Sequence, residues 1–363
     1  MTIDELLNKD VFSKDELVFL LNAKGDDLKK LFAKSAYVKE TNVGRISYLR
    51  GLIEFSNICS KNCLYCGIRK DNKLLQRYNL SDEEIIEAAK FAYKSNYASI
   101  VLQSGELESK SFINRVDFLL KSIMEETESN IGITLSCGEQ SYETYKRWFN
   151  SGARRYLLRI ESSNKDLYYK IHPNNKLHNF DRRIQCLQDM KKVGYQVGTG
   201  VMIGLPFQSI DDLANDLLFM KEIDIDMCGM GPYIEHQDTP LFQYRNELLP
   251  LKERFELTLK MIALLRIMMK DINIAASTAM QSIDKMGREK ALKIGANVIM
   301  PNITPGMYRD FYKLYENKPC TDEQAEDCMN CMEVRISLAG DEIGYNQYGD
   351  SLHYKKRVSQ DIY

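Results

Sequence analysis

The chain lacks the features that mark several large classes of protein. Its 49 Lys and Arg residues against 51 Asp and Glu residues give a net charge of −2, so no basic surplus indicates nucleic-acid binding. The longest uncharged run, Val193–Ile210, contains four Gly, a Pro, two Gln and a Ser, which argues against a membrane-spanning helix there. Only 8 Pro and 20 Gly in 363 residues argue against a low-complexity chain.

The segment Met1–Asp27 also lacks the basic stretch and following apolar stretch of a secretory signal. We therefore expect a cytoplasmic protein, and cysteines in that compartment stay reduced. The chain has nine cysteines, an odd number. In a long cytosolic chain such a set indicates metal binding or catalysis rather than a framework of disulfides.

Short β-rich runs alternate with amphipathic segments from residue 51 onward, which predicts an α/β fold. The expected strands are Leu52–Phe55, Ser99–Gln103, Ile131–Ser136, Tyr156–Ile160, Val197–Ile203, Met227–Met230, Asn273–Ala276 and Val298–Met300. The expected helices include Ser81–Lys94, Ser111–Glu126, Asp181–Lys192, Ile210–Glu222 and Glu253–Met269. Ser81 and Glu84 have the spacing of a capping box, which supports the start of the first of these helices.

Eight strands that are each followed by a helical stretch predict a TIM-like (β/α)8 barrel, with its functional loops at one end. We expect the barrel over residues 51–305. Residues 1–50 are predicted to form an N-terminal helical cap, and residues 306–363 a C-terminal extension with a helix and an irregular part.

Cys59, Cys63 and Cys66 form a C-x3-C-x2-C motif directly after the first expected strand. Three soft thiolates in eight residues suit one face of a metal cluster. A structural zinc site needs four closed ligands, but no fourth ligand lies nearby, because the next cysteine is Cys137 and the first histidine is His172. Chance clustering and a zinc site completed from afar remain the alternatives.

The segment Cys59–Cys66 resembles the motif of the radical S-adenosylmethionine superfamily. The resemblance implies a 4Fe–4S cluster on Cys59, Cys63 and Cys66, with one iron open to S-adenosylmethionine. One electron then cleaves the cofactor to methionine and a 5′-deoxyadenosyl radical. The superfamily has a full or partial TIM-like barrel, which agrees with the alternation above.

The ends of other strands carry residues that the resemblance assigns to the cofactor. Gly105 and Glu106, with Ser104 in place of a Gly, resemble the family element that binds the methionyl amine. Glu161 would accept from ribose hydroxyls, and Arg183 matches an arginine that pairs with the methionyl carboxylate, although Arg182 competes for that role. The expected cofactor-binding set is Tyr65, Ser104, Gly105, Glu106, Ser136, Glu161, Arg183 and Met202. Each charged member has the alternative of a surface charge or a structural ion pair, and Met202 that of barrel core.

A second set of residues at the barrel mouth is expected to bind an anionic substrate. Arg159 is a fixed cation, and Ser277 and Thr278 offer hydroxyl and backbone N–H groups that suit an anion. Tyr308 follows the eighth strand and is expected to reach the mouth. His236 is a minor candidate, because a lone loop histidine is more often a polar surface group.

Motifs along residues 50–335 resemble, in combination, the E-type maturase family of FeFe-hydrogenase. Members of that family carry a C-x7-C-x2-C spacing, here Cys320, Cys328 and Cys331, and the resemblance implies an auxiliary 2Fe–2S or 4Fe–4S cluster on it. A labile zinc site or an empty thiol site is the alternative. Cys186 and Cys228 are expected to be buried apolar residues, and Cys137 either faces the cavity or is buried.

The resemblance implies a radical enzyme that helps to assemble the di-iron subcluster of FeFe-hydrogenase. Its substrate would be a small anionic iron complex delivered by a sister maturase, and its electron donor a ferredoxin or flavodoxin. A paralogue acting on a small amino acid or thioether, like methylornithine synthase or biotin synthase, is the alternative, and a zinc-binding scaffold is a rival from another class. Biotin synthase needs a second cluster inside the barrel, for which only Cys137 is suitably placed. No nucleic acid or membrane is expected as a partner.

Overall fold

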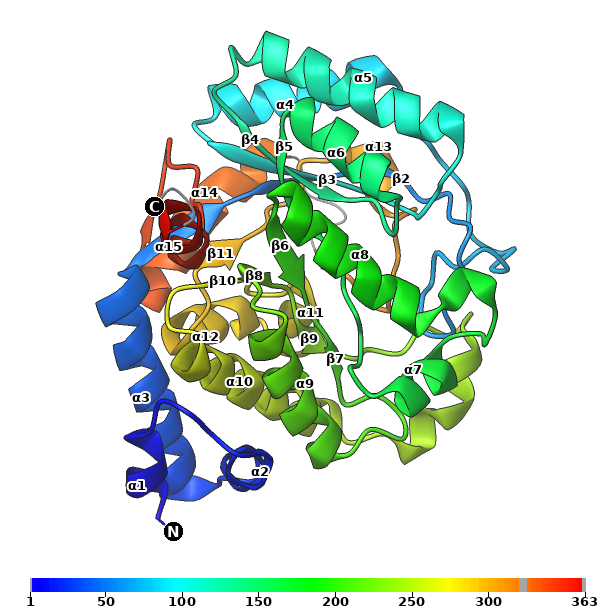
Figure 1. Cartoon of the computed structure of the whole chain (residues 1–363). Coiled ribbons are helices and arrows are strands. Elements are labelled where there is room, and N and C mark those ends of the chain that lie inside the picture. The colour runs from blue at the N-terminus through cyan, green and yellow to red at the C-terminus, as the bar shows by residue number, and fades with distance from the viewer. Residues whose placement is uncertain (1, 320–324, 361–363) are drawn as a thin grey trace.

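The computed structural model describes residues 2–319 and 325–360 of the chain, with side chains described for 2–319 and 332–359. Strands alternate with helices around a central sheet (Figure 1). Seven parallel strands pair in the order β10-β8-β6-β5-β4-β3-β2. Their bounds are β2 Gly51–Ser56, β3 Ser99–Ser104, β4 Gly132–Ser136, β5 Ala153–Leu157, β6 Gln196–Thr199, β8 Met227–Cys228 and β10 Asn273–Ile274.

The eighth strand, β11 (Val298–Ile299), joins the two edges of this sheet. On one side Val298 bridges Ala275, next to β10. On the other side β11 pairs with β1 (Ile46–Leu49), and Asn302 just beyond it bridges Leu52 of β2. These bridges close the sheet, so the predicted α/β barrel is confirmed.

The predicted helices also form, within one or two residues of their expected bounds. They are α4 Asp82–Lys94, α5 Lys110–Glu126, α8 Phe180–Val193, α9 Ile210–Glu222 and α10 Leu251–Met268. The capping box is present, since Ser81 Oγ accepts from Glu84 N at 3.2 Å and Ser81 N donates to Glu84 Oε2 at 2.7 Å. Further helices are α6 Tyr142–Asn150, α7 Lys165–Ile171, α11 Thr278–Ile283 and α12 Gly287–Ile294, and two short strands, β7 Met202–Ile203 and β9 Gly231–Pro232, pair at the mouth.

None of the helices in the described ranges is long and apolar enough to cross a membrane.

The first 50 residues form three helices and the strand β1. The helices are α1 Ile3–Leu7, α2 Lys14–Leu21 and α3 Gly25–Val43, and they pack on the outer helices α9, α10 and α12 (Figure 1). A buried ion pair of 2.6 Å between Lys39 on α3 and Asp341 ties this segment to the C-terminal part of the chain. Both side chains are 4% exposed, so the prefix is part of the same core-bearing unit.

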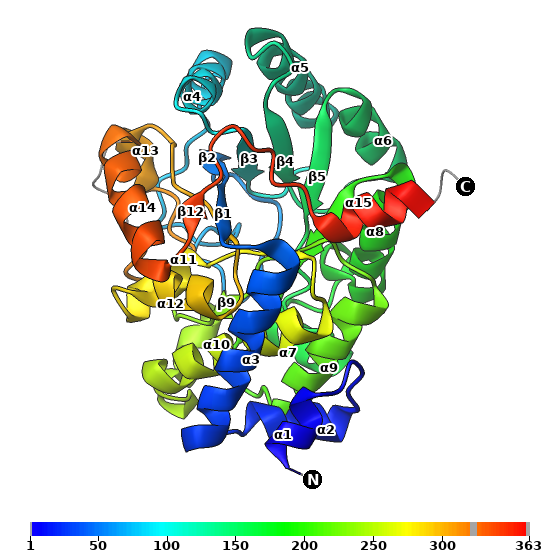
Figure 2. The same cartoon turned by 90° about the vertical axis from the view of Figure 1, so that its left-hand side faces the viewer.

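The C-terminal extension is more regular than the sequence suggested. It contains α13 Gly306–Arg309, α14 Ala325–Ala339, β12 Glu342–Ile343 and α15 Leu352–Gln360. Figure 2 shows β12 beside β1, with which it pairs in parallel. Residues 348–351 then pass beneath the strand starts, where Arg50 and Asn273 donate to Gly349 O at 3.2 and 2.8 Å and Arg155 pairs with Asp350. The tail thus covers the N-terminal end of the barrel and leaves the other end for chemistry.

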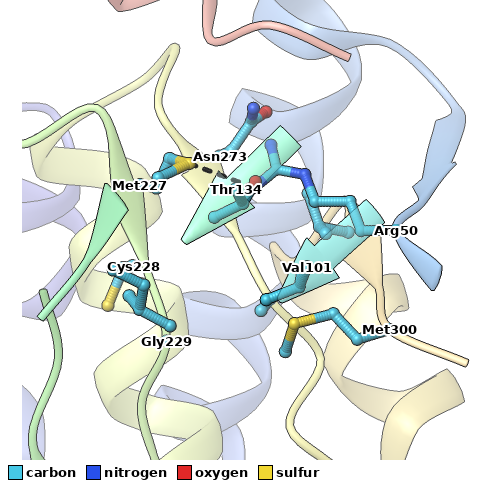
Figure 3. Close-up of a pocket in the computed structure, with 11 residues that line it drawn as sticks. Arg50, Val101, Thr134, Met227, Cys228, Gly229, Asn273 and Met300 are labelled. Atoms are coloured by element: carbon cyan, nitrogen blue, oxygen red, sulfur yellow. Dashed lines mark hydrogen bonds between the residues drawn. The ribbon is translucent and has the colours of Figure 1, made fainter. Parts of the chain in front are cut away.

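The barrel interior above this cover is lined by both apolar and polar side chains (Figure 3). Arg50, Thr134 and Asn273 face the cavity together with Met227 and Met300. Arg50 is only 5% exposed, and its Nη1 donates to Met227 Sδ at 3.0 Å. Burial lowers the pKa of Arg50, because a charged guanidinium is poorly solvated there.

The last helix, α15, is attached to the barrel mainly through charges. His353 lies 2.6 Å from Asp224 and 3.1 Å from Asp271 through its two ring nitrogens, and Arg357 pairs with the buried Asp226 at 2.6 Å. Hydrogen bonding to Asp271, and then to Asp224, raises the pKa of His353 against the opposing effect of burial. The charged imidazolium is therefore the form that the folded protein favours.

This pair of contacts predicts a pH-dependent stability. A raised histidine pKa contributes stability that is complete below the ordinary value of about 6.5 and is lost as the pH rises through the raised value. We expect His353→Ala to lower the free energy of unfolding by about 1–2 kcal/mol at pH 6 and by less at pH 9. Urea unfolding at both pH values measures this, with Lys355→Ala, an exposed change on the same helix, as the control. An equal loss at both pH values would contradict the charged contact.

Candidate active site

The three cysteines of the motif lie on the irregular segment that follows β2, at the C-terminal end of the barrel. Cys59 Sγ accepts from Glu106 N at 3.3 Å, and Ser60 N donates to Glu106 O at 2.9 Å, which ties the segment to the end of β3. Arg77 clasps the same segment, donating to Asn57 O at 2.7 Å and Ile68 O at 2.8 Å. The loop that carries the thiols is therefore held by hydrogen bonds to Glu106 at the end of β3 and by hydrogen bonds from Arg77.

The thiols themselves suit a soft metal group. Each of Cys59, Cys63 and Cys66 is partly buried, and burial raises the pKa of the Cys63 thiol to about 12. Within the described side chains, no three His, Cys, Asp or Glu groups converge on a single metal ion. Ligands of a 4Fe–4S cluster bind separate irons, so the three-thiol set fits such a cluster.

The end of β3 requires a glycine for steric reasons. A Cβ on Gly105 would lie 2.3 Å from Ile58 O and 2.8 Å from Cys59 Cβ, so only Gly allows the strand end to approach the cysteine loop. Ser104 is buried next to it and donates to Gly105 O at 2.8 Å. Gly138, with a φ of +77°, similarly leaves room for Glu106, because a Cβ there would lie 2.0 Å from Glu106 Cγ.

Glu106 belongs to a buried network of four charges. Lys61 Nζ lies 2.9 Å from Glu106 and 3.0 Å from Glu139. Arg183 Nη1 lies 2.9 Å from Glu139 and 3.6 Å from Glu106. All four side chains are at most 9% exposed. Two cations and two anions thus balance in a site where an unpaired charge would be costly.

The structure separates the two candidate arginines. Arg183 is buried and faces Glu106, and its Nε is a buried donor without a hydrogen-bond partner. Arg182 is 36% exposed, pairs with Glu108 at 2.7 Å, and reaches the network only through a longer contact of 3.5 Å to Glu139. Arg183 is therefore the arginine that lies beside the cysteine loop and the carboxylate, with a donor free for a ligand.

The remaining predicted cofactor residues lie around the same mouth. Glu161 follows β5 and is 7% exposed, and burial raises its pKa despite the ion pair of 2.8 Å with Arg159. Tyr65 and Met202 pack in one small apolar cluster, where Tyr65 OH lies 3.1 Å from His172 Nε2. Ser136 ends β4 and pairs in register with Gln103 of β3.

The predicted substrate residues are only partly brought together. Arg159 donates to Val201 O at 2.9 Å, in addition to its pair with Glu161. Ser277 caps α11, and Thr278 lines a cavity with Asn302 and Lys318.

Tyr308 corrects the expectation that it reaches the mouth. Its ring stacks on Tyr78 with the centroids 5.3 Å apart, and its hydroxyl bonds to Glu84 at the start of α4. Tyr308 lies on the short helix α13, Gly306–Arg309, and its ring packs on Tyr78, which precedes α4.

Lys318, in the C-terminal extension, forms an ion pair that could not be predicted from the sequence. Lys318 Nζ lies 2.5 and 2.7 Å from the two carboxylate oxygens of Glu54, which is 2% exposed on β2. The preceding residues are joined to the cysteine loop, since Gly67 N donates to Leu314 O at 3.0 Å. His236 is also buried against Gly67, rather than exposed. Residues 311–318, the mouth strap, therefore cover part of the barrel mouth.

The other cysteines divide as follows. Cys186 and Cys228 are buried, as predicted, and Cys137 is fully buried in the main core rather than facing an open site. Of the second triad, Cys320 lies outside the described residues. Cys328 and Cys331 are on α14, outside the residues whose side chains are described.

Sequence reasoning missed Lys61 and Glu139, although a signal existed for Glu139. Glu139 follows β4 much as Glu106 follows β3, so the strand-end argument applied to it equally. Lys61 lies between two of the motif cysteines, but nothing in a single sequence shows that its side chain turns inward. His178 was missed as well; its Nε2 accepts from Asn62 N at 2.9 Å and so holds the cysteine loop.

A barrel with a three-cysteine loop after its first strand is the arrangement of the radical SAM (S-adenosylmethionine) enzymes. A model of the Radical SAM superfamily matches residues 53–220. The chain is also 42% identical over 360 residues to the [FeFe] hydrogenase maturase subunit HydE of Thermotoga maritima. The aligned region covers 99% of this chain and 98% of the relative. The chain therefore belongs to the radical SAM superfamily and to the family of this maturase, and membership implies a 4Fe–4S cluster and S-adenosylmethionine.

Solved structures support the fold. A methylornithine synthase (PylB) superposes with a TM-score of 0.80 at 24% identity, covering 95% of this chain and 97% of that one. The FeFe-hydrogenase maturase HydG from Carboxydothermus hydrogenoformans superposes with a TM-score of 0.81 at 22% identity, covering 98% and 81%. At these identities the likeness shows the shared barrel.

The four-charge network predicts a strong imbalance when one member is removed. Lys61→Met leaves the two buried carboxylates with Arg183 as their only buried cation, beside the partly exposed Arg182, whose Nε lies 3.5 Å from Glu139. We expect it to lower the free energy of unfolding of the metal-free protein by about 3–5 kcal/mol. Adding Glu139→Gln restores the balance and should recover much of that loss. Denaturant unfolding of both single variants and the double variant measures the coupling. Additive losses would show that the two side chains do not act as a pair.

Proposed function

We propose that this chain is a radical SAM enzyme that takes part in assembling the di-iron subcluster of FeFe-hydrogenase. The observation that carries the proposal is the cysteine loop bonded to Glu106, in a chain 42% identical to a hydrogenase maturase along nearly its whole length. The thiol loop, the buried carboxylate and the buried arginine lie together at the open end of the barrel.

In this proposal Cys59, Cys63 and Cys66 hold a 4Fe–4S cluster. When bound, the cluster supplies the electron that cleaves S-adenosylmethionine to methionine and a 5′-deoxyadenosyl radical. Glu106 accepts hydrogen bonds from the ammonium group of the cofactor, for which its burial and position beside Cys59 suit it. Arg183 pairs with the carboxylate of the cofactor through its unused Nε.

The other residues orient the nucleoside and keep water out. Glu161 accepts from the ribose hydroxyls, and the apolar cluster with Tyr65 and Met202 provides a surface for the adenine. Ser104, Gly105 and Ser136 line the same strand ends. The mouth strap, held by Lys318 on Glu54, shields a reactive radical from solvent.

The substrate in this proposal is a small anionic iron complex made by a sister maturase, held by Arg159, Ser277 and Thr278. Its partners are a low-potential ferredoxin or flavodoxin and the other maturases, in the cytoplasm. Cys320, Cys328 and Cys331 would hold an auxiliary 2Fe–2S or 4Fe–4S cluster that the chemistry does not need. Because Cys137 is buried in the core, an in-barrel second cluster like that of biotin synthase is disfavoured.

The two cysteine sets should behave differently when mutated. After anaerobic reconstitution and reduction by dithionite, we expect the wild-type chain to form 5′-deoxyadenosine and to support activation of apo-hydrogenase with the sister maturases. Cys63→Ala should abolish both activities, because it removes a cluster ligand. Cys328→Ala is the matched control and should keep most of both.

The outcomes separate the competing functions. Equal loss in Cys63→Ala and Cys328→Ala would refute the peripheral role of the second triad. A wild-type chain that cleaves the cofactor but never supports hydrogenase activation would favour a paralogue acting on another small molecule. A chain that binds no iron–sulfur cluster at all would be a zinc-binding scaffold, and the proposal would fail.

A further inference from the structure

Glu161 occupies a backbone conformation that needs outside support. Its φ is +66°, a left-handed value that is costly for a residue with a side chain. The backbone on its own side is fixed by β-type hydrogen bonds, from Glu161 N to Gly200 O at 3.1 Å and from Met202 N to Glu161 O at 3.2 Å. Strain of this kind persists only where the surrounding structure fixes the turn from more than one side.

The second support comes from helix α9, through Asp216. Its Oδ1 accepts from both Ser163 N at 2.7 Å and Ser163 Oγ at 2.6 Å, two residues after Glu161. One turn earlier on the helix, Asp212 Oδ1 accepts from Asn164 Nδ2 at 2.6 Å. Two carboxylates of one helix thus fix consecutive residues of the loop that leaves β5.

Burying the carboxyl group of Asp216 costs free energy that a neutral side chain in the same contact would not cost. Its side chain is fully buried, and its Oδ2 has no hydrogen-bond partner. Burial raises its pKa to about 7, helped by the nearby carboxylates of Asp212 and Glu161. The same Oδ1 accepts both the N–H and the hydroxyl of Ser163, so this buried side chain fixes the position of the loop through two hydrogen bonds.

We propose that Asp216 is a positioning residue for S-adenosylmethionine binding, which acts through Ser163 to hold the Glu161 turn. It does not touch the cofactor itself. The inference rests on the proposed function, because it takes Glu161 as the residue that meets the ribose. In this arrangement a barrel helix fixes the loop after β5, and that loop fixes the carboxylate that binds the cofactor.

The chain supplies a control for loss of a buried aspartate elsewhere in the barrel, Asp117. This aspartate is also buried on a barrel helix, α5, and accepts from a serine hydroxyl, that of Ser151, at 2.5 Å. Unlike Asp216, it also forms ion pairs within the described residues, with Arg147 at 2.8 Å and Lys121 at 3.0 Å. Ser151 precedes β5, whereas Ser163 follows it, so the two aspartates support opposite ends of one strand. Ser151 lies at the end of the barrel away from the cysteine loop, because it precedes β5.

The test compares variants of the full-length, anaerobically reconstituted protein. The dissociation constant for S-adenosylmethionine is measured by equilibrium dialysis, with iron content and urea unfolding measured in parallel. We expect Asp216→Ala to raise the dissociation constant about tenfold at unchanged iron content. Asp216→Asn keeps an acceptor for Ser163 and should restore most of the affinity. Asp117→Ala should lower the stability and leave the affinity unchanged.

Two further variants keep the test decisive. If Asp216→Ala does not fold, Ser163→Ala removes one bond only and should weaken binding in the same direction. Combined with Glu161→Gln, Asp216→Ala should add little, because both act on one contact. Wild-type affinity in Asp216→Ala and Ser163→Ala, or equal weakening in Asp117→Ala, would overturn the inference. Absence of cofactor binding in the wild-type protein would instead defeat the proposed function.

Discussion

The site depends on one balanced set of buried charges. Lys61, Glu106, Glu139 and Arg183 come from four separate parts of the barrel mouth, and each lies within 3.6 Å of an opposite charge. Such a set is costly to bury, and only the mutual pairing makes it tolerable. Its consequence is that the cysteine loop, two strand ends and helix α8 are held in one register before any cofactor binds.

The rest of the fold supports this charge network at the C-terminal end of the barrel. The parallel barrel brings all its strand ends to one face, and the tail covers the opposite face through Gly349 and Asp350. The mouth strap adds a lid that Lys318 anchors on the buried Glu54. Helix α9 then holds the loop after β5 from outside. Layers of support around a reactive centre are what radical chemistry requires, because a misplaced radical attacks the protein or the solvent.

The sequence was enough to predict the barrel and its main helices and to single out the three-cysteine motif, because these depend on local patterns. Alternating strands and helices have a period, and the spacing of Cys59, Cys63 and Cys66 is a motif that needs no tertiary information. Residues after strand ends, such as Glu106 and Glu161, also follow from the rule that parallel strand ends meet at one face. Which of Arg182 and Arg183 is buried beside Glu106 does not follow from the sequence, because the rotation of a helix relative to the sheet is set by packing.

Contacts between segments that are far apart in the chain could not be predicted from the sequence. Lys318 meets Glu54 across 264 positions of the chain, and the ring of Tyr308 stacks on Tyr78, which lies far earlier in the chain. The central claim is that Glu106, held by this network, binds the cofactor beside the cluster. EPR spectra of the reduced, reconstituted protein with increasing S-adenosylmethionine test it most directly. The account predicts a spectrum that changes in the wild type, and a need for about tenfold or more cofactor in Glu106→Gln at equal iron content. The same half-saturating concentration in both proteins would contradict it.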